Sequence, residues 1–125
     1  MNNKEKLYNT LISCYADLNV SNVCNVDLKK LGYTPDGFIV RSIQAHSKNS
    51  NDEFALNVNC NLINDTIGGI ITANNSSTVN NSTIDFKLQT LNTNNLTLTF
   101  NKSDGTALSL TNSVFVIVLL EFYKI

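Results

Sequence analysis

A run of seven apolar residues near the carboxyl end dominates the pattern of hydrophobic and polar positions. Residues 114 to 120 read Val-Phe-Val-Ile-Val-Leu-Leu, and Glu-Phe-Tyr-Lys-Ile follows them. An uninterrupted apolar run rich in β-branched residues predicts a strand that is buried on both faces. Such a strand needs a neighbour on each side and a packed layer above and below. The run is far shorter than the roughly 20 apolar residues of a membrane-spanning helix, so we predict no membrane span.

Shorter segments upstream alternate between apolar and polar residues and supply the expected neighbours. In residues 54 to 62, apolar positions alternate with one alanine and three asparagines. This period of two predicts a strand with one face on the core and a row of asparagines on the other. Similar alternations occur in residues 84 to 88, 96 to 100 and 108 to 110. About seven or eight short strands joined by polar turns are typical of a mainly β fold, an antiparallel β-sandwich or jelly roll.

The first 31 residues have a different pattern. A helix over residues 4 to 18 would place Leu7, Leu11, Tyr15 and Leu18 on one apolar stripe. An extended arm that packs on a neighbouring subunit would use the same residues. A turn at Pro35 then precedes the next strand. We therefore predict an N-terminal helix or arm in residues 1–31, able to dock on a partner, and a β-sandwich domain in residues 32–125.

Composition narrows the range of partners. Charged residues make up 15% of the chain and the formal net charge is −1, whereas about 25% charged residues is typical. Such a chain lacks the basic patch that nucleic acid or an anionic membrane would attract, so neither is predicted as a partner. The three cysteines, Cys14, Cys24 and Cys60, are not at metal-ligand spacing. Together with the lack of a visible secretory signal, they are predicted to be reduced thiols of a cytoplasmic product.

The sequence does not predict that the residues able to carry catalysis lie close together. His46 is the single histidine, and Cys60 is the nucleophile to test with it. If residues 47 to 52 close a hairpin, His46 and Cys60 lie about 20 Å apart along the strands. The oxygen-rich loop at residues 49 to 53 could suit calcium but lacks the EF-hand spacing, and a solvated loop explains it better. We predict no enzymatic activity, no cofactor and no metal.

The row of asparagines allows two interpretations. Asn57, Asn59 and Asn61 could hydrogen-bond a glycan or a partner protein, or could form a neutral solvated surface. Sugar-binding sheets commonly add an aromatic platform. The chain has no tryptophan, and Tyr33 and Tyr123 are the best candidates for that role.

Residues 32 to 40 read Gly-Tyr-Thr-Pro-Asp-Gly-Phe-Ile-Val, and Asn- and Ser-rich alternating strands and a closing Glu-Phe-Tyr-Lys-Ile follow them. With this layout, residues 32 to 125 resemble small β-sandwich domains of bacteriophage virion proteins, such as head fibres, capsid decoration proteins and tail-fibre tips.

This resemblance implies a non-enzymatic structural protein located in the virion and made in the host cytoplasm. Its partners would be capsid or other virion proteins, and it would be a homo-oligomer, with a trimer favoured. The chain has no long shaft, so an accessory (auxiliary or decoration) capsid protein or head-fibre protein that presents a β-sandwich outward is favoured. The alternative is a glycan- or receptor-binding adhesin module of a tail fibre.

Overall fold

The computed structural model describes residues 8–18, 20–47, 54–63, 65–72, 78–81, 85–88, 94–102 and 114–125. Its regular elements are nine strands and one short 3-10 helix. The elements are β1 (Tyr8–Asp17), β2 (Val23–Asp27), η1 (Leu28–Leu31), β3 (Gly37–Ser47), β4 (Phe54–Cys60), β5 (Asp65–Thr72), β6 (Thr78–Asn81), β7 (Asp85–Lys87), β8 (Asn95–Lys102) and β9 (Val114–Lys124). None of the helical structure described here is long and apolar enough to cross a membrane.

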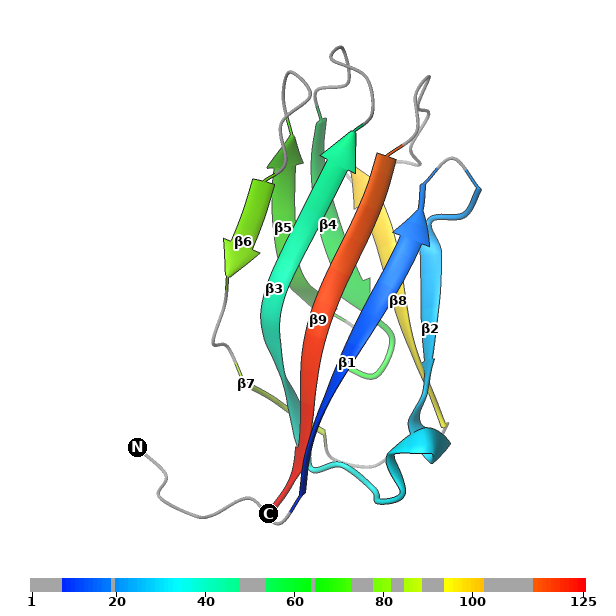
Figure 1. The fold of residues 1–125 in the computed structure, drawn as a ribbon, viewed down its shortest axis with the longest axis vertical. Helices are drawn as coiled ribbons and strands as arrows, with labels where there is room; N and C mark the ends of the chain where they lie inside the picture. The colour runs from blue at the N-terminus through cyan, green and yellow to red at the C-terminus, as the bar shows by residue number, and fades with distance from the viewer. Residues whose placement is uncertain are drawn as a thin grey trace.

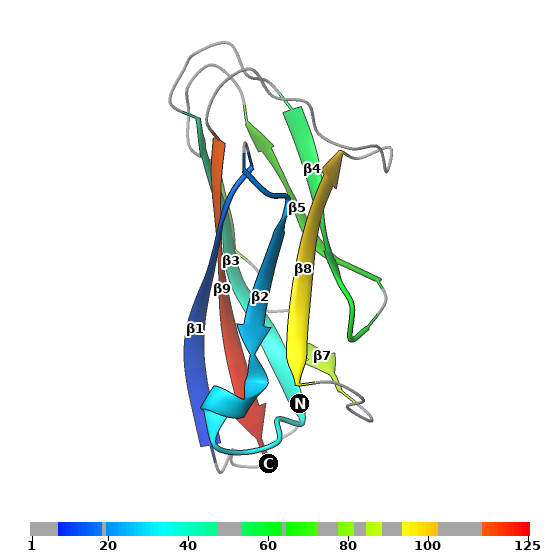
Figure 2. The same cartoon turned by 90° about the vertical axis from the view of Figure 1, so that its right-hand side faces the viewer.

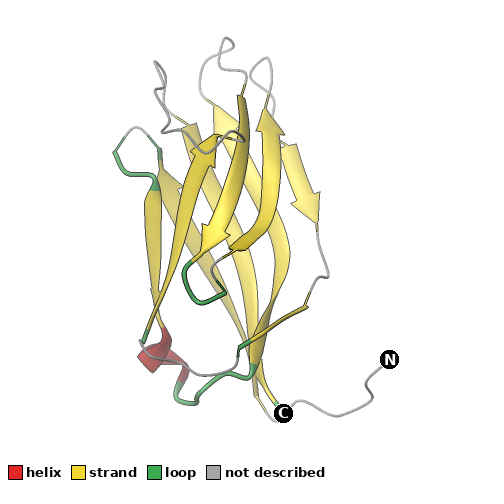
Figure 3. Cartoon of the chain, turned by 180° about the vertical axis from the view of Figure 1, so that it is seen from behind, coloured by secondary structure: helices red, strands yellow, loops and turns green. Residues whose placement is uncertain are grey.

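The strands form two antiparallel sheets packed face to face (Figure 1). One sheet has the order β1-β9-β3-β6, with β7 also paired to β3, and the other has the order β2-β8-β4-β5. Figure 2 shows the two layers from the side. The helix η1 lies at the same end of the sandwich as the carboxyl end of β9, as the view from behind also shows (Figure 3).

The strand pairing is that of a jelly roll. β1 pairs with β9, β2 with β8, β3 with β6 and β7, and β4 with β5, so the ladders are nested like one long folded hairpin. Rolling up this hairpin brings β9 beside β3 and β8 beside β4. The predicted β-sandwich or jelly roll is confirmed, and the strand order identifies the class as a jelly roll.

The terminal strand β9 has the predicted central position, between β1 and β3. Its inward residues Val116, Val118, Leu120 and Phe122 are buried in the core. Its outward residues Phe115 and Leu119 are only partly buried, and Ile117 is exposed. The prediction that both faces are covered is therefore wrong for the outer side of β9 at Phe115, Ile117 and Leu119 within this chain.

The helix predicted over residues 4 to 18 is wrong for the described residues, because Tyr8–Asp17 form β1. All ten residues of β1 pair with β9, and this ladder satisfies backbone groups that a helix would satisfy internally. Cys14, Ala16 and Leu18 point into the core, whereas Leu11, Ser13 and Tyr15 alternate with them on the outside. β1 belongs to one sheet and β2 to the other.

The expectation of three reduced cysteines is also corrected. Cys14 of β1 and Cys24 of β2 form a disulfide, with their Cα atoms 6.4 Å apart, and Cys60 is a buried free cysteine. Because β1 and β2 belong to opposite sheets, the bond links the two layers at one edge of the sandwich.

Candidate functional site

Exposed apolar side chains gather on the outer side of β1 and β9. Leu11 is 61% exposed, Tyr15 55% and Ile117 37%. Tyr15 lies opposite Ile117 in the ladder, and its ring stacks on that of Phe115 with centroids 5.7 Å apart. We call this surface, formed by Leu11, Tyr15, Phe115, Ile117 and Leu119, the apolar face.

The apolar face contains two of the four residues predicted to dock on a partner. Leu11 and Tyr15 lie on the apolar face. Leu18 is buried in the core, because its side chain points to the inner side of the sheet, as those of Cys14 and Ala16 do. Leu7 lies outside the described residues. The docking role of residues 1–31 itself stays a prediction.

A buried charge borders the apolar face on β9. Glu121 is 5% exposed. It accepts a hydrogen bond from Arg41 Nε at 2.7 Å, a second from Arg41 Nη2, and one from Asn9 Nδ2 at 2.6 Å. A register shift in β3 between Val40 and Ser42 makes Arg41 the extra residue of a bulge, which re-aims its side chain. The network ties β1, β9 and β3 together across the outer side of the sheet.

A second polar cluster forms where β7 meets the end of β9. Tyr123 donates a hydrogen bond to Asp85, and Lys87 Nζ lies 2.8 Å from the phenol oxygen and 3.0 Å from Asp85 Oδ2. Burial, and then the bond to Asp85, raise the pKa of Tyr123, so it is a neutral phenol near neutral pH. The Tyr123 ring covers Gly37, where an added Cβ would collide with it. Tyr123 is therefore a buried structural residue and not an exposed platform for a sugar.

The outer side of the other sheet is polar. Asn25, Asn57, Asn59, Thr97 and Thr99 point outward from β2, β4 and β8, and we call this surface the amide face. Its side chains bond one another: Thr97 donates to Asn25 Oδ1 at 2.7 Å, and Thr66 of β5 donates to Asn59 Oδ1 at 2.7 Å. Asn57 and Asn59 of the predicted row therefore lie on the outer side of the sheet, and their role in binding a glycan or a partner stays a prediction.

Asn61, the third residue of the predicted row, has a structural role. Its Nδ2 donates to the Asn95 carbonyl at 3.2 Å, and its Oδ1 accepts from the Thr97 backbone N–H at 2.7 Å. The amide therefore continues the pairing with β8 just beyond the end of β4. Because both its Nδ2 and its Oδ1 make these bonds, the Asn61 amide has less capacity to hydrogen-bond a ligand than the sequence suggests.

The candidate catalytic pair is not assembled. His46 is exposed on the outer side of β3, whereas Cys60 is buried on the inner side of β4, in the other sheet. The assumed hairpin is wrong, because β3 pairs with β9 and not with β4. Burial raises the pKa of the Cys60 thiol, which disfavours the nucleophilic thiolate. Within the described ranges no group of three or more His, Cys, Asp or Glu could hold a metal, and the loop at residues 49 to 53 lies outside those ranges.

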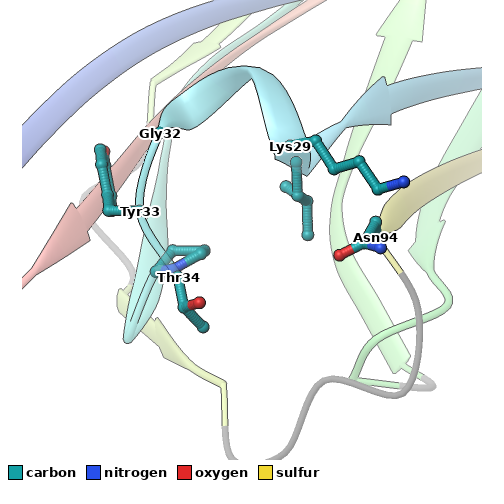
Figure 4. A pocket seen from close by; sticks show the side chains of 7 residues that line it. Lys29, Gly32, Tyr33, Thr34 and Asn94 are labelled. Carbon is teal, nitrogen blue, oxygen red and sulfur yellow. The ribbon is translucent and has the colours of Figure 1, made fainter.

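A pocket of about 330 Å³ opens at the η1 end of the sandwich. It is lined by Leu28, Lys29, Gly32, Tyr33, Thr34, Pro35 and Asn94. Figure 4 shows Tyr33 and Thr34 on one side of the opening and Lys29 and Asn94 on the other. Sequence reasoning assigned residues 32 to 37 only to a turn, because nothing in the sequence places Asn94 beside η1.

No protein-family model and no curated protein sequence matches the chain. Among solved structures, Tobacco streak virus coat protein aligns over 98% of this chain and 90% of that chain, at 10% identity and a TM-score of 0.40. The carbohydrate-binding module CBM36, solved with calcium and xylotriose, aligns over 94% and 90%, at 15% identity and a TM-score of 0.40. A capsid chain of cyanophage Pam1 aligns over 100% and 92%, at 15% identity and a TM-score of 0.35. These similarities are too distant to assign a function.

Proposed function

We propose that the chain is a non-enzymatic structural protein of a phage particle, an accessory capsid (decoration) or head-fibre protein. It attaches to the capsid through the apolar face of β1 and β9 and turns the amide face outward. The observation that carries this proposal is the exposure of Leu11, Tyr15 and Ile117 on the outer side of β1 and β9, because exposed apolar patches with polar surroundings mark interaction sites.

Two further features support a particle protein. The jelly roll is a fold of capsid proteins and of lectins, although a fold alone does not define a function. The Cys14–Cys24 disulfide suits a protein displayed on a virion surface, where disulfides persist. We expect the bond to form after the chain leaves the reducing cytoplasm of the host.

The first test counts the chain in particles. Density-purified particles from the source of the sequence are analysed by quantitative mass spectrometry against the most abundant capsid protein. A copy ratio near one, or a simple fraction of it, is expected for a decoration protein. A handful of copies would indicate a tail adhesin instead, and absence from the particles would refute the proposal.

The second test removes the apolar face without disturbing the core. Leu11→Lys is preferred to an acidic substitution, because the ladder partner of Leu11 is the buried Glu121 and like charges directly opposite destabilise a sheet. We expect the folding free energy to change by less than about 0.5 kcal/mol and binding to chain-depleted particles to be lost.

The matched control is Asn25→Lys, which adds the same charge at an exposed position of the amide face. This variant is expected to bind particles like the unmodified chain. Equal loss of binding in both variants would show that charge, and not the apolar face, decides attachment. Sedimentation of the unmodified chain separately tests the trimer that the resemblance to phage virion proteins implies.

A further inference from the structure

The pocket at η1 has walls that are fixed by hydrogen bonds. The Leu28 N–H donates to the Asn94 carbonyl at 2.7 Å, which joins the two sides of the opening. Asp27 caps η1 by accepting from the Lys29 N–H at 3.0 Å. Gly32 ends η1 with a left-handed φ of 76°, and its N–H donates to the Lys29 carbonyl, a conformation that glycine adopts without strain.

The polar groups that line the pocket are available to a ligand. Among the described residues, none supplies a hydrogen-bond partner to the Lys29 ammonium, the Thr34 hydroxyl or the Asn94 side-chain amide. Lys29 carries the one formal charge of the lining residues. The nearby carboxylates are engaged elsewhere, Asp27 at the cap of η1 and Asp36 with the Ile125 N–H at 2.8 Å. The Lys29 ammonium is therefore the group in the pocket that could pair with a carboxylate of a ligand.

The remaining lining is apolar and rigid. The Tyr33 ring stacks on the ring of Tyr8, with centroids 5.0 Å apart. The Tyr33 hydroxyl lies 2.8 Å from Thr10 Oγ1 and 3.2 Å from the Phe122 carbonyl, which fixes the ring. Pro35 and Leu28 are buried beside it. An apolar lining of Leu28, Tyr33 and Pro35 with a few polar groups suits the apolar and hydroxylated sides of a sugar ring.

We propose that this pocket binds a hexuronic acid residue of a glycan. The carboxylate pairs with Lys29, the sugar hydroxyls bond Thr34 and Asn94, and the ring packs against Tyr33. The volume of about 330 Å³ is at the lower end of the range for ligand pockets, so one sugar residue is held. The site is separate from the apolar face and does not depend on the proposed attachment to a capsid.

The test is a titration of the full chain, labelled with ¹⁵N, followed by its backbone amide shifts in NMR. The probes are D-glucuronic acid and D-galacturonic acid, with D-glucose and acetate as references. For a ligand of this size we expect a dissociation constant of about 1 mM. Saturable shifts are expected at residues 28 to 34 and at Asn94, weaker shifts with glucose, and no saturation with acetate at the same concentration.

Lysine substitutions make the test specific to the pocket. Lys29→Met should weaken uronate binding about tenfold or more, as expected for a lost charge-assisted bond. Lys30→Met is the matched control, because Lys30 belongs to the same turn of η1 but does not line the pocket, and it should leave binding unchanged.

Three results would overturn the proposal. These are no saturable shift with either uronic acid, equal losses in both lysine variants, and acetate binding as tightly as the uronic acids. The last result would indicate a general carboxylate site, such as one for a peptide terminus. Because particle attachment is not measured in this titration, its outcome leaves the capsid proposal untouched.

Discussion

The outer faces of the two sheets differ more than any other two regions of the molecule. On β2, β8 and β4 the outward positions include Asn25, Asn57, Asn59, Thr97 and Thr99. Thr97 bonds Asn25, and Thr66 of β5 bonds Asn59. On β1 and β9 the outward positions include Leu11, Tyr15 and Ile117, which remain exposed. Both sheets bury the same kind of aliphatic and aromatic inner face.

The difference shows that one core can carry two unlike surfaces. The amide face consists of polar side chains that water can solvate, and few of them are charged, so no partner has to bury it. The apolar face leaves aromatic and aliphatic surface in water, which contributes nothing to folding until something covers it. If the apolar face is a contact surface, changing it should affect association and leave the fold nearly unchanged, whereas changing what holds the two sheets together should affect the fold.

The largest expected effect comes from the covalent link between the sheets that carry the two faces. Reducing the Cys14–Cys24 disulfide should lower the free energy of unfolding by about 3 kcal/mol, the amount expected for a short closed loop. The measurement is urea unfolding with and without a reductant.

A double variant, Cys14→Ala with Cys24→Ala, is the control, and reductant should not move its unfolding midpoint. If reductant leaves the midpoint of the unmodified chain unchanged as well, the link between the two sheets does not stabilise the sandwich.

A smaller effect is expected at the buried ion pair that borders the apolar face. Arg41→Met leaves the Glu121 carboxylate buried with Asn9 as a remaining partner. A fully buried pair that loses one partner costs more, but the Arg41 side chain is 38% exposed, so we expect a loss of about 2 kcal/mol.

Gln44→Met is the control, because Gln44 is exposed on the same strand, and it should change stability by less than about 0.5 kcal/mol. Equal stability of Arg41→Met and Gln44→Met in urea unfolding would show that water replaces the hydrogen bonds that the Glu121 carboxylate loses with Arg41. Substitutions at the border of the apolar face would then change stability as little as substitutions at its centre.

Much of this fold could be predicted from the period of the hydrophobic pattern. The alternation of residues 54 to 62 and 96 to 100 gave strands with the inward and outward sides that the structure has. The N-terminal error has a simple cause, since Leu7, Leu11 and Tyr15 are four residues apart. Four is an even number and close to one helical turn, so both a strand and a helix place these residues on one side. Only the step of three to Leu18 distinguishes the two, and Leu18 went into the core.

Features that depend on strand order could not be predicted from local pattern. Cys14 and Cys24 meet because β1 and β2 lie in opposite sheets at the same edge, which ten residues of sequence separation do not reveal. Asn94 lines the pocket because β8 runs beside β2. The hairpin assumed across residues 47 to 52 failed for the same reason, since a jelly roll places the strands before and after this segment, β3 and β4, in different sheets.

The smallest expected effect comes from exchanging similar side chains between the two outer faces. Ile117→Thr makes the apolar face more polar, and Thr97→Val makes the amide face more apolar, while all four residues are β-branched and suit a strand. Each variant should change the free energy of unfolding by less than about 1 kcal/mol. Particle binding should weaken in Ile117→Thr and stay unchanged in Thr97→Val, which serves as its control. If Ile117→Thr instead unfolds the isolated chain while Thr97→Val does not, the outer side of β9 supports the fold itself, and its exposure would no longer identify a contact surface.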